Sequence, residues 1–198
     1  MINHLSIVTK QGKEIAEISQ DLAQLRIAVF RDFPYLYEGS LEYEKDYLQV
    51  YEASENALVW AIYNQNGMVG ATTALPLSHE SSELQRPFLQ AGLSIDSIFY
   101  FGESMLLKPY RGLGFGSKFF DVREAHARSF GTYQTACFCA VQRSEQHPLK
   151  PPRYRPNDNF WKRKGYEPLQ GITCSMAWPD LGETNPTSKE MQFWSKSL

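Results

Sequence analysis

The 198-residue chain has only three cysteines, and it has no long apolar run. Cys137, Cys139 and Cys174 cannot all pair, so no disulfide framework is indicated and a reducing compartment is the simpler interpretation. No stretch approaches the roughly 20 apolar residues of a membrane helix. The start, Met1 to Leu5, lacks a charged region followed by a long apolar one, so we expect no signal peptide. We therefore expect a cytoplasmic protein with no membrane partner.

Neither sign of charge dominates the chain. Lysine and arginine number 20 against 22 acids, which gives a net charge of −2. A nucleic-acid surface needs a basic face, so we expect no nucleic-acid partner. Neither the cysteines nor the four histidines have zinc spacing, so we expect no metal. Hydrophobic residues make up 42%, enough for a sizeable core, and the length suits one domain over residues 1–198.

Three glycines alternate within one hexapeptide, Arg111-Gly112-Leu113-Gly114-Phe115-Gly116. A β-rich run precedes it and an amphipathic run, 117–130, follows it. Glycine has no Cβ and accepts positive φ, so such a turn can approach a ligand closely. The first amides of the following helix lack intrahelical partners, and with the helix dipole they form an anion site, typically for phosphate. The alternative is a strand-to-helix turn with no ligand.

Better-known motifs do not fit this region. The dinucleotide fingerprint would need glycine at Ser117, and the nucleotide P-loop would need a different order of Ser117 and Lys118. The segment from Gly102 to Leu106 lacks the closing glycine of a nucleophile elbow, so a serine hydrolase is not indicated. The pattern that fits is R-x-x-G-x-G, carried by Arg111, Gly114 and Gly116.

Hydrophobic periodicity and turn signals predict an alternation of strands and helices. The predicted elements are a strand at 5–8, helices at 15–29 and 41–51, a hairpin of strands 57–63 and 68–75, a short helix at 84–91, a strand at 98–107, a helix at 117–130, a strand at 133–141, a helix at 157–164, and strands at 172–178 and 191–194. Alternation would put Phe99, Phe101, Glu103, Met105 and Leu107 on one face of their strand. The order predicts an α/β (α+β) fold, with a mixed central β-sheet and helices on both faces.

Two sequence motifs resemble motifs of the GNAT superfamily of acyl-CoA N-acyltransferases. R-x-x-G-x-G is similar to its coenzyme A pyrophosphate loop, and the segment from Asn159 to Tyr166 is similar to its late helix. The element order is also that of the family, so the resemblance covers nearly the whole chain. It implies a bacterial-type member with a GNAT-like domain that transfers acetyl from acetyl-CoA directly to the amine of a small molecule. The alternative is a non-catalytic module that binds coenzyme A or acyl-CoA.

The resemblance also assigns the donor site. It places the donor between two parallel strands that splay apart, at 98–107 and 133–141. Main-chain groups of Met105, Leu106 and Leu107 would pair with the pantetheine arm, and an amide near Leu106 would face the thioester oxygen. The pyrophosphate would lie on the turn formed by Arg111, Gly112, Leu113, Gly114, Phe115, Gly116 and Ser117.

Glu103 is the candidate base, because it is a lone ionisable residue in an apolar strand and burial would raise its pKa. The family often uses a glutamate on this strand. The alternative is a structural carboxylate. The family's usual acid, a tyrosine on the late helix, is replaced here by Trp161, which we expect to pack against pantetheine or the core. Tyr154, or water, is the substitute acid.

The acceptor side is predicted from composition. Tyrosines and acids cluster between Tyr35 and Tyr47, and a long proline-containing loop at 142–156 is basic. A cation over an aromatic face gains about 0.5–2 kcal/mol, so an amine suits this cluster. We therefore expect a small cationic or neutral amine as acceptor. A homodimer is compatible with this interpretation.

Overall fold

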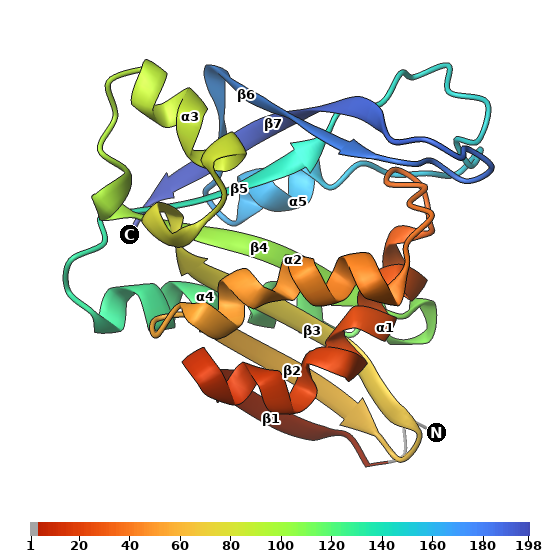
Figure 1. The fold of residues 1–198 in the computed structure, drawn as a ribbon, viewed down its shortest axis with the longest axis horizontal. Helices are drawn as coiled ribbons and strands as arrows, with labels where there is room; N and C mark the ends of the chain where they lie inside the picture. The colour runs from red at the N-terminus through yellow and green to blue at the C-terminus, as the bar shows by residue number, and fades with distance from the viewer. Residues whose placement is uncertain (1–3) are drawn as a thin grey trace.

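The computed structural model describes residues 4–198 as a mixed seven-stranded sheet in the order β1-β2-β3-β4-β5-β7-β6 (Figure 1). The strands are β1 (Ser6–Gln11), β2 (Leu58–Asn64), β3 (Gly67–Pro76), β4 (Ile98–Leu106), β5 (Thr135–Val141), β6 (Glu167–Trp178) and β7 (Thr187–Ser197). The helices are α1 (Ser19–Phe30), α2 (Leu41–Ala53), α3 (Ser82–Gln90), α4 (Phe115–Ser129) and α5 (Asp158–Arg163). Met1 to Asn3, where the segment considered for a signal peptide begins, lie outside the described residues.

The predicted element order is confirmed, and three of the elements differ most in extent from the prediction. The first predicted helix begins as a 3-10 turn, Gly12–Ile18, before α1 starts at Ser19. Its apolar residues Ile15 and Ile18 are buried all the same, which is why they fitted the helical pattern. The strands β6 and β7 are longer than predicted, because many of their residues are polar and face solvent, and only the apolar parts stood out in the sequence.

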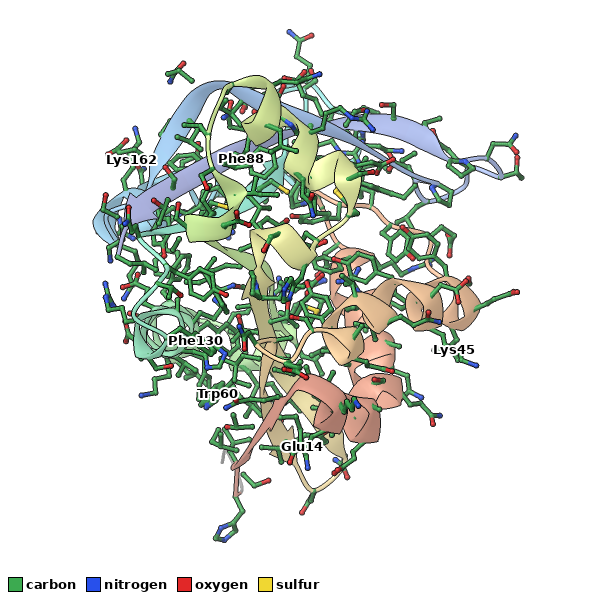
Figure 2. The ribbon with its side chains drawn as sticks, turned by 60° about the vertical axis from the view of Figure 1, so that its left-hand side comes forward. Glu14, Lys45, Trp60, Phe88, Phe130 and Lys162 are labelled. Carbon is green, nitrogen blue, oxygen red and sulfur yellow. The ribbon has the colours of Figure 1, made fainter. Side chains whose placement is uncertain are left out.

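Helices cover both faces of the sheet, as predicted. On one face α1, α2 and α3 bury a cluster that includes Leu22, Leu48 and Phe88. On the other, α4 and α5 bury an aromatic cluster around Phe120 and Phe138. Figure 2 shows side chains filling the space between these layers, with Lys45 projecting from α2 away from the sheet. The sheet therefore separates two cores, and a group on β4 faces one or the other.

A β-bulge decides which core each residue of β4 faces. Thr72 pairs with Ser104 while Ala74 pairs with Phe101, so Gly102 and Glu103 together oppose Thr73. The extra residue reverses the alternation of side chains. Phe101 and the earlier Phe99 consequently pack on the α4 side, whereas Glu103 and Met105 face α1 and α2. The prediction that these residues share one face is wrong for this reason.

Glycine is required at the bulge. A Cβ on Gly102 would collide with the Tyr51 hydroxyl and the Thr73 side chain. Only a residue without a side chain lets β4 bend here while both of these groups stay close to the strand.

The strands β4 and β5 diverge after a short parallel contact. Ile98 to Tyr100 pair with Thr135 to Cys137, and within residues 4–198 no further pairing joins the two strands. From the bulge onward one edge of β4 is therefore free of strand partners. In Figure 1 the two strands open toward the end of the molecule where the 142–156 loop lies.

Glu80, just after β3, is a buried carboxylate with one unused oxygen. Only 7% of the residue is exposed. Its Oε2 accepts from the Ser81 N–H at 3.0 Å, and among the described residues Oε1 has no donor. Burial raises the pKa of Glu80 from 4.5 to about 7, against a lowering by the hydrogen bond from the Ser81 amide; the charge of Glu103 raises the pKa and that of Arg26 lowers it. Between pH 4.5 and about pH 7 the unfolded chain has lost the Glu80 proton, whereas the folded chain keeps it. The free energy of unfolding therefore falls as the pH rises through this range.

We expect Glu80→Gln to remove this part of the pH dependence. The wild-type free energy of unfolding should fall by up to about 3 kcal/mol between pH 4.5 and pH 7 and then level off, because each pKa unit corresponds to ~1.4 kcal/mol. The glutamine variant should be the more stable protein at pH 8. Urea unfolding at pH 5 and pH 8 measures the difference, with Glu83→Gln on the exposed side of α3 as control. Identical pH profiles for wild type and Glu80→Gln would contradict the assignment.

Candidate active site

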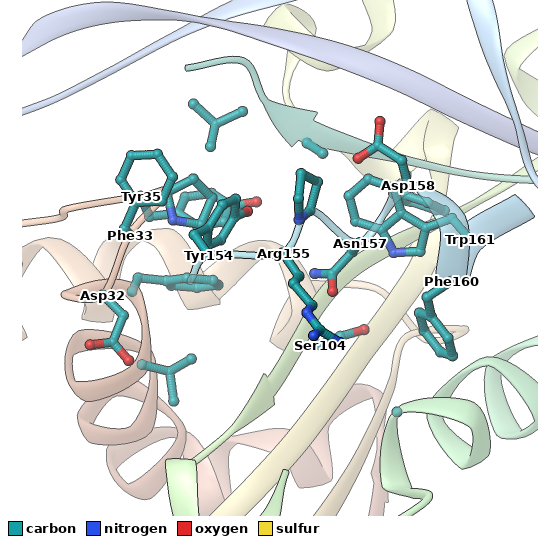
Figure 3. Close-up of a pocket in the computed structure, with 18 of the residues that line it drawn as sticks. Asp32, Phe33, Tyr35, Ser104, Tyr154, Arg155, Asn157, Asp158, Phe160 and Trp161 are labelled. Carbon is teal, nitrogen blue, oxygen red and sulfur yellow. The ribbon is translucent and has the colours of Figure 1, made fainter. Parts of the chain in front are cut away.

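A cavity of about 740 Å³ occupies the opening between β4 and β5 (Figure 3). Its walls come from β4, the glycine turn, α4, β5, the 142–156 loop, α5 and the segment after α1. Sequence-predicted residues that line it are Glu103, Leu106, Arg111, Gly112, Gly116, Tyr154 and Trp161. Met105, Leu107, Leu113, Gly114, Phe115 and Ser117 do not line it. Met105 is fully buried in the core, and Leu113 is exposed.

The glycine turn has the backbone that its sequence predicts. Gly112 and Gly114 have φ of +79° and +87°, whereas Gly116 is already helical. Gly114 is the N-cap of α4 and offers no side chain, and the Lys118 N–H donates to its carbonyl at 3.1 Å. The amides just before Lys118 therefore have no partner within the helix. The start of α4 thus presents free N–H groups at the edge of the cavity, an arrangement that suits an anion.

Two cations stand at the mouth beside this turn. Asp32 accepts from Arg111 at 3.2 Å and lies 2.8 Å from Lys108. Arg111 also donates through Nε to the Leu106 carbonyl at 3.0 Å. Asp32 had not stood out in the sequence, because it follows α1 and meets these cations only through the fold.

The free edge of β4 offers main-chain groups to the cavity. The Leu107 N–H donates to the Val69 carbonyl of β3 at 3.0 Å. Because neighbouring residues in a strand point their main-chain groups to opposite sides, the N–H of Leu106 points toward β5 and the cavity. The Leu106 amide is therefore available to a ligand, whereas the Leu107 amide is engaged by β3.

Glu103 lies at the bulge with both carboxylate oxygens occupied. It is 5% exposed. Its Oε1 accepts from Arg26 in a close ion pair and from the Tyr47 hydroxyl at 2.6 Å. Its Oε2 accepts from the Tyr51 hydroxyl at 3.1 Å and from Thr73. Two carboxylate oxygens have about four acceptor positions, so four donors satisfy the group.

Arg26 joins Glu103 to a second buried acid. Its Nε donates to Glu44, which is completely buried, and its guanidinium lies 3.9 Å from the centre of the Tyr47 ring. Burial alone would lower the pKa of Arg26, but Glu103, Tyr47 and Glu44 more than offset it, and the pKa is raised well above the usual value. Arg26 was missed in the sequence, although it stands four residues after Leu22 on the buried side of α1. A charge at such a position is the signal that could have found it.

A further buried arginine supports the bulge from the other face. Arg123, on α4, is 2% exposed and donates to the carbonyls of Phe119 and Glu103 at 3.2 Å each. Its guanidinium lies over the Phe101 ring at 4.4 Å. Burial lowers the pKa of Arg123 to about 10, so it stays charged at neutral pH. No acidic side chain of residues 4–198 lies within ion-pair distance of it.

Tyr154 and Trp161 lie in different parts of the wall. Tyr154 packs edge-on against Phe33 at 4.7 Å, which ties the 142–156 loop to the segment after α1 (Figure 3). Burial raises the pKa of Tyr154, and the charges of Asp158 and Glu145 add to it, so the hydroxyl keeps its proton at neutral pH. Trp161 packs against Phe138 and Trp194 at 5.0 and 5.1 Å.

Among residues 4–198, no group of three His, Cys, Asp or Glu side chains could hold a metal ion. No helix in that part of the chain has both the length and the apolar character needed to cross a membrane.

The similarity of this chain to known proteins lies in its fold rather than in its sequence. No protein-family profile matches the sequence, and no curated protein matches it. Solved structures do match over nearly their whole length. An acetyltransferase from Streptococcus agalactiae 2603 is 13% identical with a TM-score of 0.60, covering 97% of this chain and 98% of its own. A GNAT-family acetyltransferase from Staphylococcus aureus Mu50 is 11% identical with a TM-score of 0.61, covering 98% and 99%.

A eukaryotic structure matches equally well. Arabidopsis thaliana NAA60, in complex with a bisubstrate analogue, is 11% identical with a TM-score of 0.58, covering 97% of this chain and 98% of its own. Identities this low speak for the fold alone, which here is a mixed seven-stranded sheet with helices on both faces. The chain has the fold of the GNAT acetyltransferases.

Proposed function

We propose that this protein is an acyl-CoA-dependent N-acyltransferase of the GNAT superfamily, which transfers acetyl from acetyl-CoA directly to the amine of a small molecule. The observation that carries the proposal is the continuity of one cavity. It begins at the unpartnered amides of α4, runs along the free edge of β4 and reaches Glu103 at the bulge. An anionic head with an extended, hydrogen-bonding arm and a reactive end fits these three parts in order.

In this proposal the pyrophosphate lies on the amides that open α4, beside Arg111 and Lys108. In this structure the Asp32 carboxylate pairs with both of these cations at the mouth of the cavity, as a bound anion would. The pantetheine arm lies along β4, where the Leu106 amide is free. Trp161 and Phe138 form the apolar wall opposite.

The chemistry requires four events. A protonated amine first loses one proton to water and becomes nucleophilic. Its nitrogen then attacks the thioester carbonyl carbon and gives up a second proton, the C–S bond breaks, and the coenzyme thiolate takes a proton. We propose that Glu103 receives the amine proton through the Tyr47 hydroxyl, since the carboxylate itself is filled by four donors. Tyr154, which remains protonated and lines the cavity, is the proposed donor to the thiolate.

A non-catalytic acyl-CoA-binding module is the second candidate. It is favoured by Trp161 at the position where the family's tyrosine acid usually stands. The two candidates differ in turnover: an enzyme releases free thiol from acetyl-CoA in the presence of an amine, whereas a binding module shows coenzyme affinity without thiol release. The three cysteines are free and buried, which suits the proposed cytoplasmic, reducing location.

We expect Gly116→Ala to weaken coenzyme A binding at least about tenfold, because the new methyl group would stand at the anion site. In the free protein it would meet nothing closer than the Phe160 ring at 3.7 Å, an ordinary contact, so the fold should tolerate it. Calorimetry of coenzyme A binding measures the effect, with thermal unfolding as the check on folding.

Gly114→Ala and Gly131→Ala form a matched pair for the same experiment. Both glycines have positive φ, at +87° and +70°, and both have open space at the Cβ position. Each alanine should cost about 1 kcal/mol of stability or more. Only Gly114→Ala, at the turn, should also lose coenzyme affinity. Unchanged affinity in folded Gly114→Ala and Gly116→Ala would contradict the proposed pyrophosphate site.

We expect Glu103→Gln to lower turnover by roughly 10²–10⁴-fold while coenzyme binding persists, because the proton acceptor is lost. Tyr47→Phe should lower turnover in the same direction, since it keeps the ring but removes the hydroxyl that leads to Glu103. The measurement is thiol release against pH, with Glu42→Gln as an exposed control on α2. Wild-type rates in Glu103→Gln across neutral pH would remove this carboxylate from the mechanism.

A further inference from the structure

A second, smaller cavity opens on the α1–α2 side of the sheet. Its volume is about 80 Å³. It shares Phe30, Tyr35, Gly102, Glu103 and Cys139 with the large cavity, so the two spaces meet at the β4 bulge. A molecule in the small cavity would therefore approach the reacting end of a donor from the face opposite α4.

The walls of this small cavity are mostly aromatic. Tyr43 and Tyr47 stack with ring centres 6.5 Å apart, Tyr37 meets Tyr43 edge-on at 6.1 Å, and Tyr35 meets Trp178 at 6.0 Å. One face of Tyr47 is taken by Arg26. The remaining rings offer electron-rich faces that attract a cation, and two methionines complete an apolar lining.

The charge beneath these rings is unbalanced. Arg26 is a single cation between two buried acids, Glu44 and Glu103, so these three side chains carry a net charge of −1 on the α1–α2 side. The other buried cation at the bulge, Arg123, lies on the α4 side, where it donates to the main-chain carbonyl of Glu103. Among the described residues, Glu44 Oε1 accepts no hydrogen bond, and the hydroxyl of the buried Tyr37, which lines the cavity, has no partner. Burial and then the charge of Glu44 raise the pKa of Tyr37, so these two groups lie close together. A buried excess charge is costly unless something neutralises it. A ligand that is cationic would supply the missing charge.

The charges behind Trp178 do not change this balance. Arg143 donates to both oxygens of Asp180 at 2.7 Å, and Lys189 lies 3.2 Å from Asp180 and 3.6 Å from Glu183. Two cations and two acids cancel there. An anionic group on a ligand would meet the uncompensated acid of the small cavity, and a second cation would be placed against Arg26.

The size of the cavity limits the ligand further. One water needs about 10–15 Å³ of such space, so 80 Å³ holds roughly five to eight non-hydrogen atoms. We infer that the small cavity selects a compact monoamine, a primary amine with a single positive charge and a short apolar body, as the acyl acceptor. Amino acids, polyamines and larger polar amines are disfavoured. This inference rests on the proposed function only in naming the ligand as the acceptor; the binding of the amine stands apart from it.

A set of four probes with similar skeletons tests the inference by calorimetry on the full chain, with and without coenzyme A. n-Butylamine should bind. 1-Butanol lacks the charge, norvaline adds a carboxylate and 1,4-diaminobutane adds a second cation, so each should bind at least about tenfold more weakly than n-butylamine. Equal or tighter binding of any of the three, or no binding of n-butylamine, would overturn the inference.

Variants connect this selectivity to the named residues. Glu44→Gln should weaken n-butylamine about tenfold and leave coenzyme A binding unchanged, while Glu42→Gln, on the exposed side of the same helix, should alter neither. Tyr43→Leu removes an aromatic face from a ring that is 48% exposed, so it should fold normally and also weaken the amine. An unaltered amine affinity in both Glu44→Gln and Tyr43→Leu would overturn the assignment of the pocket.

These experiments test the acceptor inference and the proposed transferase function separately. If n-butylamine binds with this selectivity but releases no thiol from acetyl-CoA, the amine site stands and the transferase proposal fails. If thiol is released with many amines regardless of charge and size, the transferase proposal stands and the selectivity fails.

Discussion

The buried carboxylate of Glu103 is the constraint on which the rest of this structure depends. Four elements converge on it: Arg26 from α1, Tyr47 and Tyr51 from α2, Thr73 from β3, and the bulge of β4 that aims it. Removing one partner of a buried ion pair costs about 3–5 kcal/mol, because the other charge is left uncompensated. The bulge, α1 and α2 therefore stabilise one another, and the divergence of β4 from β5 begins just before the bulge, after Tyr100.

The bulge also lies where the large and the small cavity meet. On its α4 side the opening is bordered by Arg111, Lys108 and the free amides of a helix. On its α1–α2 side the small cavity adjoins Arg26, Glu44 and Glu103, three side chains that together carry one excess negative charge. A polyanionic donor and a cationic acceptor would thus be drawn to opposite faces of the sheet and would meet at Gly102 and Glu103. The charge pattern therefore favours the donor on the α4 side and the acceptor on the α1–α2 side. That preference does not depend on similarity to other proteins.

The sequence predicted what depends on local pattern. The hairpin of β2 and β3, the helices α2 and α4, and the left-handed glycines of the turn follow from periodicity and from residues that only certain turns accept. The bulge was not predicted, because an extra residue in β4 leaves a mostly apolar strand almost unchanged in composition; Gly102 was its only local sign. Arg26 was missed for a related reason, since its burial depends on acids 18 and 77 residues away. The small cavity could not be predicted either, because α1, α2, β4, β5, β6 and β7 all contribute to its walls.

A crystal structure of the protein grown with coenzyme A tests most directly whether a coenzyme A thioester lies in the opening between β4 and β5. We expect electron density with the pyrophosphate on the amides between Gly112 and Ser117, the pantetheine arm along β4 beside Leu106, and the sulfur near the bulge at Glu103. Density for coenzyme A elsewhere on the protein, or crystals in which the opening stays empty at saturating coenzyme A while other sites fill, would contradict it.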